Sequence, residues 1–450
     1  MKEYTYTYDV INDFPNVVGE TQLPLFSYES TREVSSGDKS MLSLFSGCGG
    51  MDLGFEGGFI CHKASVGQQG WIQQKINDNW VLLKKNQFRT IFANDILKEA
   101  RTAWLNYMRR FNVEEDVYRS ESIVDLVKSH QAGIKVFPKN IDIVTGGFPC
   151  QDFSVAGKRK GFESGMNHDG KQRQKDAPSE ETRGKLYFWM KQVIDITKPK
   201  MFIAENVKGL VSLGDVKEII QGDFASADGD GYIVLDPQVL HAGDYGVPET
   251  RERVIFIGIR KNALKKKALE ALTSDNIPDD YNPYPKATHH YNATSKGKLR
   301  PVTCRMVLGE LVEPGVSMDL SQQCFSKAKY MGNHCQGQTE INLDGLGPTI
   351  RSEHHGNIEF RRLSAEHGGK ITEELQKGLP ERRLTPRECA MIQTFPPDFP
   401  FVKRKGYTKN FELNTSGAYK VIGNAVPPVL AYQIARRIQQ LWPLYFKNNK

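Results

Sequence analysis

The sequence predicts an α/β fold with two parts: a larger domain built on a parallel sheet, and a smaller domain of irregular structure. Short apolar runs typical of buried strands alternate with helical patterns over residues 39–262. A glycine-rich turn joins the first strand to the helix that follows it. After Arg260 the alternation ends, and polar and turn-forming residues dominate to about residue 380. We therefore expect helices on both faces of one sheet, with the irregular part outside it.

The predicted elements follow in chain order. Strands are expected at 41–45, 90–95, 141–147, 200–207 and 253–259, and helices at 96–111 and 185–197. Two further helices are expected near the end, at 385–395 and 427–442. Thr385 suits the N-cap of the first of these, and Pro386 suits its first turn.

Composition excludes several classes of protein. The 450 residues carry a net charge of +7, which permits an anionic partner without requiring one. No apolar run approaches the roughly 20 residues of a membrane span, and the first residues lack the layout of a signal peptide. The seven cysteines form no CxxC pair, so neither a disulfide framework nor a closed zinc site is indicated. We expect an intracellular, cytoplasmic protein without a metal.

The glycine turn is the first candidate for ligand binding. In the stretch FSGCGGMDLGF, Gly47, Gly49 and Gly50 would let a ligand approach the backbone closely. Asp52 occupies the last glycine position of the dinucleotide fingerprint, which favours a nucleoside cofactor without a pyrophosphate. Asp95, at the end of the second strand, either accepts hydrogen bonds from ribose hydroxyls or caps the next helix.

Cys150 stands in the stretch GGFPCQDFS, directly after a strand. A lone cysteine is more often a buried filler than a nucleophile. Ligands of open α/β sheets, however, bind at the carboxyl ends of strands, which is where this thiol is expected. To act as a nucleophile it must reach the thiolate state, which needs local positive charge or a helix N-terminus.

Three charged residues mark two further strand ends. Glu205 ends an apolar strand, where burial would raise its pKa and let it hold a proton near neutral pH. Arg251 and Arg253 alternate at the start of the next strand and would project to the same side. Taken singly, the glutamate could cap a helix and the arginines could lie in solvent.

The motifs in combination resemble those of the DNA (cytosine-5) methyltransferases. FSGCGGMDLGFE, GGFPCQDFS, AENVKGL, RERVIFIG, RRLTPRECAMIQTFP and GNAVPP occur in the order that this family shows, within residues 41–262 and 381–435. The resemblance implies a Rossmann-like S-adenosylmethionine-dependent methyltransferase domain with a smaller, irregular target recognition domain. Its expected parts are an N-terminal extension (1–38), the catalytic and cofactor-binding domain (39–262), the target recognition domain (263–414) and a C-terminal segment that returns to the catalytic domain (415–450).

The resemblance also assigns the catalytic roles. Cys150 would add to C6 of a cytosine, and the resulting enamine would attack a methyl sulfonium through C5. Glu205 would contact the ring N3 and the exocyclic amine and supply a proton. Arg253 would reach the carbonyl oxygen of the base, and Arg251 would support the loop or the base. The family performs this chemistry on a base flipped out of duplex DNA.

The implied cofactor is S-adenosyl-L-methionine, which leaves as S-adenosyl-L-homocysteine. The residues that would bind it come from four parts of the chain: Phe45, Gly47, Gly49 and Gly50 in the glycine turn, Asp95 at the ribose, Leu186 packing nearby, and Asn424 at the methionine end.

This chain departs from the family pattern at several places. The family binds the adenine amine through an aspartate after its third strand, whereas the corresponding stretch of this chain offers Ser122, with Asp125 nearby. Glu249 stands where the arginine motif usually has glutamine. Two segments, 63–89 and 164–182, are unusual or longer than the common form, and none of these departures removes a catalytic residue.

The expected partner is double-stranded DNA. Phosphate contacts are expected from the active-site loop and its extension, which contribute Lys158, Arg159, Lys160, Lys171, Arg173 and Lys175. Base contacts are expected from the second domain, with His289, His290, Tyr291 and Arg305 as candidates. We expect a monomer that modifies the target of a cognate restriction endonuclease without binding that enzyme stably.

Three other functions fit parts of the pattern. The same chemistry on RNA is possible, because one branch of this fold family methylates transfer RNA, although that branch keeps a small variable domain. A non-catalytic DNA-binding regulator would be expected to lose Cys150 or Glu205, and both are present. A nicotinamide enzyme is disfavoured by Asp52 and by the Pro-Cys-Gln loop.

Overall fold

The computed structural model describes residues 32–149, 186–291, 297–332, 334–352 and 358–447. Cys150 lies outside the described residues, as do the basic side chains predicted to contact phosphates and the long segment at 164–182. The predicted N-terminal extension is described only from Arg32 onward.

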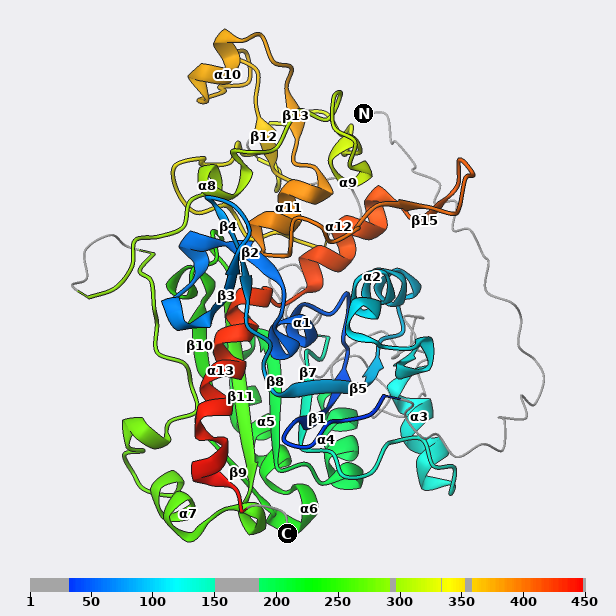
Figure 1. The fold of residues 1–450 in the computed structure, drawn as a ribbon, viewed down its shortest axis with the longest axis vertical. Coiled ribbons are helices and arrows are strands. Elements are labelled where there is room, and N and C mark those ends of the chain that lie inside the picture. The colour runs from blue at the N-terminus through cyan, green and yellow to red at the C-terminus, as the bar shows by residue number, and fades with distance from the viewer. Residues whose placement is uncertain (1–31, 150–185, 292–296, 333, 353–357, 448–450) are drawn as a thin grey trace.

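One eight-stranded sheet forms the centre of the molecule, so the predicted α/β class is confirmed (Figure 1). Its main order is β10-β11-β8-β7-β1-β5-β6, and β9 also pairs with β11. The strands are β1 (Lys39–Leu44), β5 (Phe88–Asn94), β6 (Tyr118–Arg119), β7 (Ile143–Gly146), β8 (Met201–Val207), β9 (Tyr232–Val234), β10 (Gln238–His241) and β11 (Glu252–Arg260).

The sheet is mixed, which differs from the parallel sheet that the sequence predicts. Strands β6, β5, β1, β7 and β8 run parallel, whereas β11 pairs antiparallel with β8, β9 and β10. Only ten residues, 242–251, join β10 to β11. A parallel crossover needs a dozen or more residues, so these two strands pair as antiparallel neighbours.

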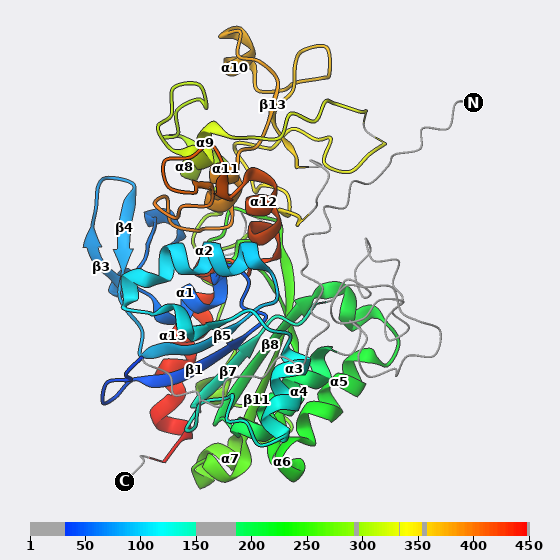
Figure 2. The ribbon, with the colours of Figure 1, turned by 90° about the vertical axis from the view of Figure 1, so that its right-hand side faces the viewer.

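Helices cover both faces of the sheet (Figure 2). Alternate residues of β11 show the division, since Val254 and Phe256 face one hydrophobic core while Ile255 and Ile257 face the other. On the first face pack α3 (Ile123–Gln131), α4 (Leu186–Thr197), α5 (Val216–Ala225) and α6 (Ala227–Asp230). On the second pack α1 (Gly50–Glu56), α2 (Lys98–Met108), α7 (Lys266–Leu272) and α13 (Pro428–Tyr445).

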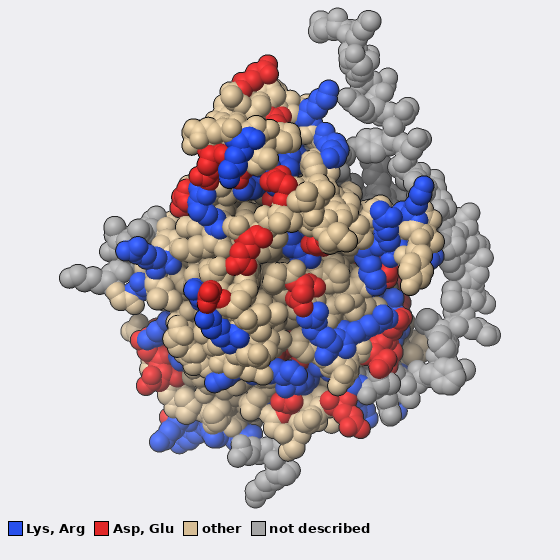
Figure 3. All heavy atoms as spheres, turned by 45° about the horizontal axis from the view of Figure 1, so that its top comes forward, with Lys and Arg blue, Asp and Glu red and all other residues tan. Residues whose placement is uncertain are grey.

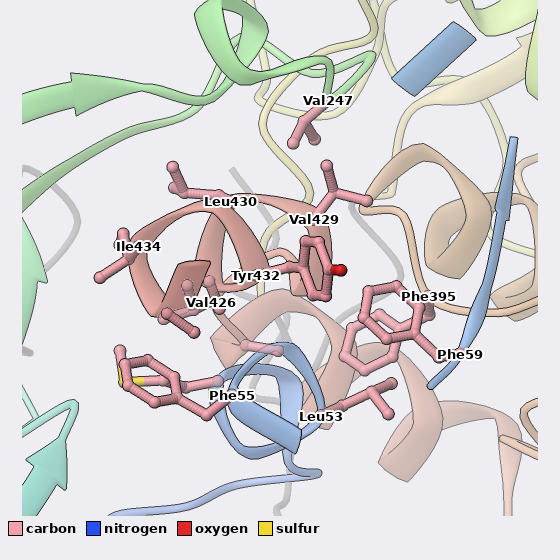
Figure 4. Packing of buried hydrophobic residues seen from close by; sticks show 14 of the residues in the cluster. Leu53, Phe55, Phe59, Val247, Phe395, Val426, Val429, Leu430, Tyr432 and Ile434 are labelled. Atoms are coloured by element: carbon pink, nitrogen blue, oxygen red, sulfur yellow. The ribbon is translucent and has the colours of Figure 1, made fainter. Parts of the chain in front are cut away.

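The C-terminal helix α13 lies directly against α1, although residues 57–427 separate them in the chain (Figure 4). Gly54 permits this approach, because a Cβ there would lie 2.4 Å from that of Ala431 and 2.7 Å from the carbonyl oxygen of Pro428. Phe59 and Tyr432 pack edge to face beside this contact. The last helix thus completes the core of the first domain.

The second domain lies above the sheet in Figure 1 and contains short elements joined by irregular chain. These elements are α8 (Cys304–Leu308), α9 (Leu320–Gln323), α10 (Thr372–Gln376) and α11 (Pro386–Ile392), with the strand pairs β12 (Phe360–Arg362) and β13 (Arg382–Arg383), and β14 (Lys403–Arg404) and β15 (Phe411–Leu413). Helix α12 (Thr415–Asn424) begins the C-terminal segment that follows them. Thr385 caps α11 in a capping box with Glu388, which confirms the predicted N-cap.

The chain directly after β11 packs on the first domain. The hydroxyl of Tyr284 donates to the carbonyl oxygen of Ile255 in β11, and Arg437 in α13 donates to that of Asn282. We therefore propose that the second domain begins some 25 residues later than position 263.

The unusual segment at 63–89 forms much of a small antiparallel sheet, β2 (Ile60–His62), β4 (Trp80–Leu83) and β3 (Ile72–Lys75), in the order β2-β4-β3. Trp71 packs edge to face on Tyr432 of α13. The indole of Trp80 donates to Glu310 of the second domain at 2.8 Å. This insertion therefore bridges the two domains.

Among the described helices, none is both long enough and apolar enough to cross a lipid bilayer.

Candidate active site and cofactor site

The adjacent ends of β7 and β8 carry the candidate acid, Glu205. Gly146 at the end of β7 is the register partner of Ala204 in β8, so the two strands end side by side. A Cβ on Gly147 would lie 2.9 Å from Oε2 of Glu205, so glycine leaves the room that this carboxyl group occupies. The position of the Glu205 carboxyl group therefore depends on a glycine after the end of β7.

Glu205 is buried and forms an ion pair with Arg253 of β11, with Nε and Oε1 2.7 Å apart. Burial raises the pKa of the Glu205 carboxyl group, while the positive charges of Arg253 and Arg251 oppose this. The pair thus joins a carboxyl group with raised pKa to a guanidinium group at the edge of the sheet. Such a pair can donate a proton and a hydrogen bond to neighbouring atoms of one planar ligand.

Asn206 holds the chain that leads to Cys150. Its side-chain amide donates to the carbonyl oxygen of Phe148 at 3.2 Å, two residues before the cysteine. We assign no role to Asn206 from the sequence. A buried asparagine at the end of an apolar strand must satisfy its amide, and this requirement is the signal that points to it.

Arg251 is buried and donates to three backbone carbonyl groups. Its acceptors are Ile350 of the second domain at 3.1 Å, Gly423 at 2.9 Å and Ala425 at 2.8 Å. Glu249 accepts from the backbone N–H of Ile350 at 2.7 Å, so Glu249 and Arg251 both bind the backbone of the same residue. Arg251 and Arg253 therefore differ in their surroundings: the first joins three stretches of backbone, whereas the second pairs with Glu205.

The glycine turn has one open position and two filled ones. Gly47 has a φ of 55° and nothing within 4 Å of where a Cβ would be. A Cβ on Gly49 would lie 2.6 Å from the indole of Trp104, and one on Gly50 would lie 2.2 Å from the carbonyl oxygen of Val426. Only Gly47 thus leaves space beside the backbone for a ligand. Phe45, at a φ of 51°, adds strain typical of functional turns.

Asp95 connects the end of β5 to the glycine turn that follows β1. Its carboxylate accepts from the backbone N–H of Gly47 at 3.0 Å and from that of Leu97 at 2.9 Å. The second bond goes to Leu97, the N-cap residue of α2, and that helix has no side-chain cap, so Asp95 is not its N-cap. A carboxylate has about four lone-pair sites, so it retains acceptor capacity for a ligand. Ile96 beside it is an exposed apolar side chain (48%), which the sequence patterns do not single out.

Asp52 stabilises the glycine turn through two buried hydrogen bonds. Its carboxylate accepts from the hydroxyl of Ser43 at 2.5 Å and from the indole of Trp104 at 2.6 Å. Burial raises its pKa to about 6, and both hydrogen bonds oppose that effect. Asp52 thus links β1, α1 and α2 around the glycine turn. An acid inside an apolar helix is the sequence signal for this role, because it needs buried partners.

Asn424 is exposed at the end of α12, close to the turn. The contact of Gly50 with Val426 brings the two segments together, and the thiol of Cys48 bonds to the carbonyl oxygen of Val421 at 3.3 Å. Leu186 is buried at the first position of α4, one turn before Met190, whose sulfur packs against Gly146.

Several predicted contact residues are engaged elsewhere. Both ring nitrogens of buried His289 are bonded, to the hydroxyl of Thr288 and to the carbonyl oxygen of Ala64. Arg305 pairs with Asp344 and Glu373, and Tyr291 stacks on His241. Of the adenine candidates, Ser122 caps α3, and Asp125 is exposed.

Within the described ranges, no group of three or more His, Cys, Asp or Glu side chains is arranged to hold a metal ion.

The chain is similar to known methyltransferases over most of its length. It is 31% identical to the Type II methyltransferase M.BsuRI of Bacillus subtilis, over 98% of this chain and 91% of that protein. It is 30% identical to M.BspRI of Lysinibacillus sphaericus, over 91% and 84% respectively. The crystal structure of the S. pombe Dnmt2 methyltransferase matches with a TM-score of 0.52 and 17% identity, covering 90% of this chain and 99% of that one, which shows the fold alone.

A family description covers the same region. Residues 39–440 match the family described as C-5 cytosine-specific DNA methylase, a range that contains every site residue named above. The protein therefore belongs to the C-5 cytosine-specific DNA methylase family.

Proposed function

We propose that this enzyme transfers a methyl group from S-adenosylmethionine to C5 of a cytosine that is flipped out of duplex DNA, through a covalent bond to Cys150. The ion pair of Glu205 and Arg253 carries this proposal. It presents one carboxyl group from β8 and one guanidinium group from β11, beside the end of β7, the strand that precedes the cysteine. These are the groups needed to hold N3, the amine and the carbonyl oxygen of one pyrimidine.

The steps assign a task to each side chain. The thiolate of Cys150 forms a bond to C6, while Glu205 gives a proton to N3 and Arg253 donates to the carbonyl oxygen. C5 then takes the methyl group that the cofactor would supply. A base removes the C5 proton, the N3 proton returns to Glu205, and the C6–sulfur bond breaks to release Cys150 as the thiolate. Asn206 and Arg251 act as positioning residues, because their bonds go to backbone carbonyl groups.

The residues around the glycine turn fit S-adenosylmethionine, which supplies the methyl group as a sulfonium. Gly47 leaves open space beside the backbone, and Asp95 keeps acceptor capacity for two ribose hydroxyls. Phe45 and Ile96 offer partly exposed apolar surface for a purine. We propose that Asn424, exposed at the end of α12, contacts the methionine end of the cofactor. We assign Gly49 and Gly50 to close packing of the turn and propose that Leu186 supports the pocket through α4.

The relatives named Type II methyltransferases suggest the setting. We propose that the enzyme protects the target of a cognate restriction endonuclease in the cytoplasm, as a monomer, because one chain carries the acid, the nucleophile and the cofactor turn.

Bisulfite sequencing of plasmid DNA from expressing cells tests this function. We predict protected cytosines within one short recurring sequence, and none with Cys150→Ala. Glu270→Gln, an exposed change on α7, is a control that should leave the pattern intact. Protection by the Cys150→Ala variant would rule out the thiol as nucleophile, and absence of protection by the wild type would rule out the activity on DNA.

A further inference from the structure

Arg383 holds one loop of the second domain. We call residues 326–332 and 334–338 the pinned loop; position 333 lies outside the described residues and is no part of it. The buried guanidinium group of Arg383 donates to the carbonyl oxygens of Ala328 and Lys329, both at 3.1 Å, and also to that of Gly337. A single side chain thus fixes both ends of the loop. Its planar fork of donors suits this task in a way that lysine would not.

Further contacts inside the pinned loop restrict its middle. The side-chain oxygen of Gln338 accepts from the backbone N–H of Met331 at 2.8 Å. Tyr330 stacks on His367, with ring centroids 4.4 Å apart, and His367 in turn pairs with Glu381. The loop is therefore preorganised without belonging to a sheet.

The outward side chains of the pinned loop alternate with packed ones. Lys327, Lys329 and Met331 are exposed, while Ala328 and Tyr330 between them are partly buried. This period of two is that of an extended chain with one free side. His334 and Gln336 continue the exposed set. In Figure 2 the yellow-green chain of this segment extends to the right, away from α8 and α9.

The exposed side chains have the chemistry that reads base edges. Lysine donates to O6 and N7 of guanine, glutamine bonds to adenine through its amide, and an apolar group contacts the methyl group of thymine. The ammonium of Lys327 lies over the ring of Phe325 at 3.4 Å. Both residues border a hollow of about 520 Å³ that also reaches Lys329 and Arg383. The loop thus presents donors beside a concave surface.

The pinned loop is also connected to the catalytic site. The guanidinium of Arg351 donates to the side-chain oxygen of Gln336 at 3.4 Å. The backbone of Arg351 packs on Gly423, and the preceding carbonyl, that of Ile350, accepts from Arg251. The segment that contains Ile350 and Arg351 therefore connects Gln336 to Arg251 of the arginine motif. Its amide N–H groups remain available, because only its oxygen accepts from Arg351.

We propose that the pinned loop reads the base edges of the target sequence, through Lys327, Lys329 and Gln336. This inference rests on the proposed function, since it assigns specificity to the same DNA substrate. It replaces His289 and Arg305 as candidates, because the groups of both are bonded within the protein.

The charge distribution on the second domain favours recognition of the DNA sequence by particular residues over general electrostatic attraction to DNA. Among the residues that the structure describes, basic and acidic side chains are mixed over most of the face in Figure 3. A surface of this kind gives little sequence-independent affinity, because such affinity comes from clustered positive charge.

The test compares specificity rather than total activity. The target is first read from bisulfite sequencing of DNA methylated by the wild-type enzyme. Lys329→Ala and Gln336→Ala are then assayed on duplexes that carry each single base change in that target. Lys267→Ala, an exposed lysine on α7 in the first domain, is the matched control. We expect each loop variant to lose about 10- to 100-fold discrimination at one base position and to keep its affinity for S-adenosylmethionine.

Two results would overturn the inference while leaving the proposed function intact. One is an unchanged preference in both loop variants. The other is an equal loss of rate on every duplex, together with a weaker dependence on salt, which marks a phosphate contact. A wild-type enzyme that methylates no cytosine would instead overturn the proposed function, and the inference with it.

Discussion

In the proposed mechanism, the chemistry of the site depends on Glu205 and Arg253. Glu205 is buried and Arg253 is partly buried, so their charges interact more strongly than they would in water. Burial raises the pKa of Glu205, which keeps its acid form populated to a higher pH than for an ordinary glutamate. In the proposed mechanism this acid form gives a proton to the base. The rate should therefore fall as the pH rises through the raised pKa.

We predict that Glu205→Gln lowers kcat by about 10²- to 10⁴-fold, because the amide keeps the shape of the side chain but has no proton to give. Cofactor affinity should stay unchanged, and the alkaline fall in rate should vanish from the pH profile. Single-turnover methylation at several pH values measures both effects. Glu252→Gln, a neighbour that pairs with Lys208 at the surface, is the control and should keep both the rate and its pH dependence.

Asp52 is a second buried acid whose charge state should affect stability. Its folded pKa of about 6 exceeds the ordinary value of 3.8, so protonation favours the folded state. This contribution is fully present below about pH 4 and is lost as the pH rises through about 6. The difference between the folded and the ordinary pKa of Asp52 corresponds to about 3 kcal/mol of unfolding free energy.

We predict that Asp52→Asn removes this dependence on pH. The wild type should lose stability relative to the variant between pH 4 and pH 7, and melting temperatures over that range measure the change. Parallel curves for the two proteins would show that the Asp52 carboxyl group titrates alike in the folded and unfolded chains.

At the scale of elements, helix α13 completes the first domain by packing on α1. Leu53 and Phe55 of α1 share a hydrophobic core with Val429, Leu430 and Ile434 of α13, and Figure 4 shows these side chains around the contact. The approach is close because Gly54 has no Cβ. The first helix and the last should therefore stabilise each other.

We predict opposite effects for two glycine-to-alanine changes in helices. Gly54→Ala should lower stability by about 1–3 kcal/mol, because the added methyl group meets Ala431 and the backbone of α13. Gly222→Ala in α5 has nothing within 4 Å and should raise stability by about 0.5–1 kcal/mol. Thermal unfolding of both variants decides the matter, and a stabilised Gly54→Ala protein would contradict the close packing.

At the scale of the whole molecule, much of the large domain could be predicted from sequence. Five strands and the helices at 98–108, 186–197, 386–392 and 428–445 lie where apolar periodicity and capping residues indicate them. These signals are local, since a strand or helix encodes its own buried face. The antiparallel pairing of β11 was missed because strand direction depends on connections, which local patterns do not encode.

Motif order predicts Glu205, Arg253 and Asp95 as site residues, and the structure pairs the first two at 2.7 Å. It does not predict their surroundings, because the bonds of Arg251 to Ile350 and Gly423 join segments about 100 and 170 residues away. Contacts over such distances leave no periodic signal. The role of the insertion at 63–89 was missed for the same reason, since Glu310, the partner of its Trp80, lies in the other domain.

The most direct test of the central claim, that Glu205 and Arg253 hold a cytosine for attack by Cys150, is to trap the covalent adduct. A duplex with 5-fluorocytosine at the target position cannot lose a proton from C5, so the bond to sulfur should persist after methyl transfer. We predict a protein–DNA complex that survives denaturation and whose mass includes one methyl group. Cys150→Ala should form none, and Glu205→Gln should form it more slowly. A wild-type enzyme that methylates ordinary cytosine but forms no such complex would contradict the account.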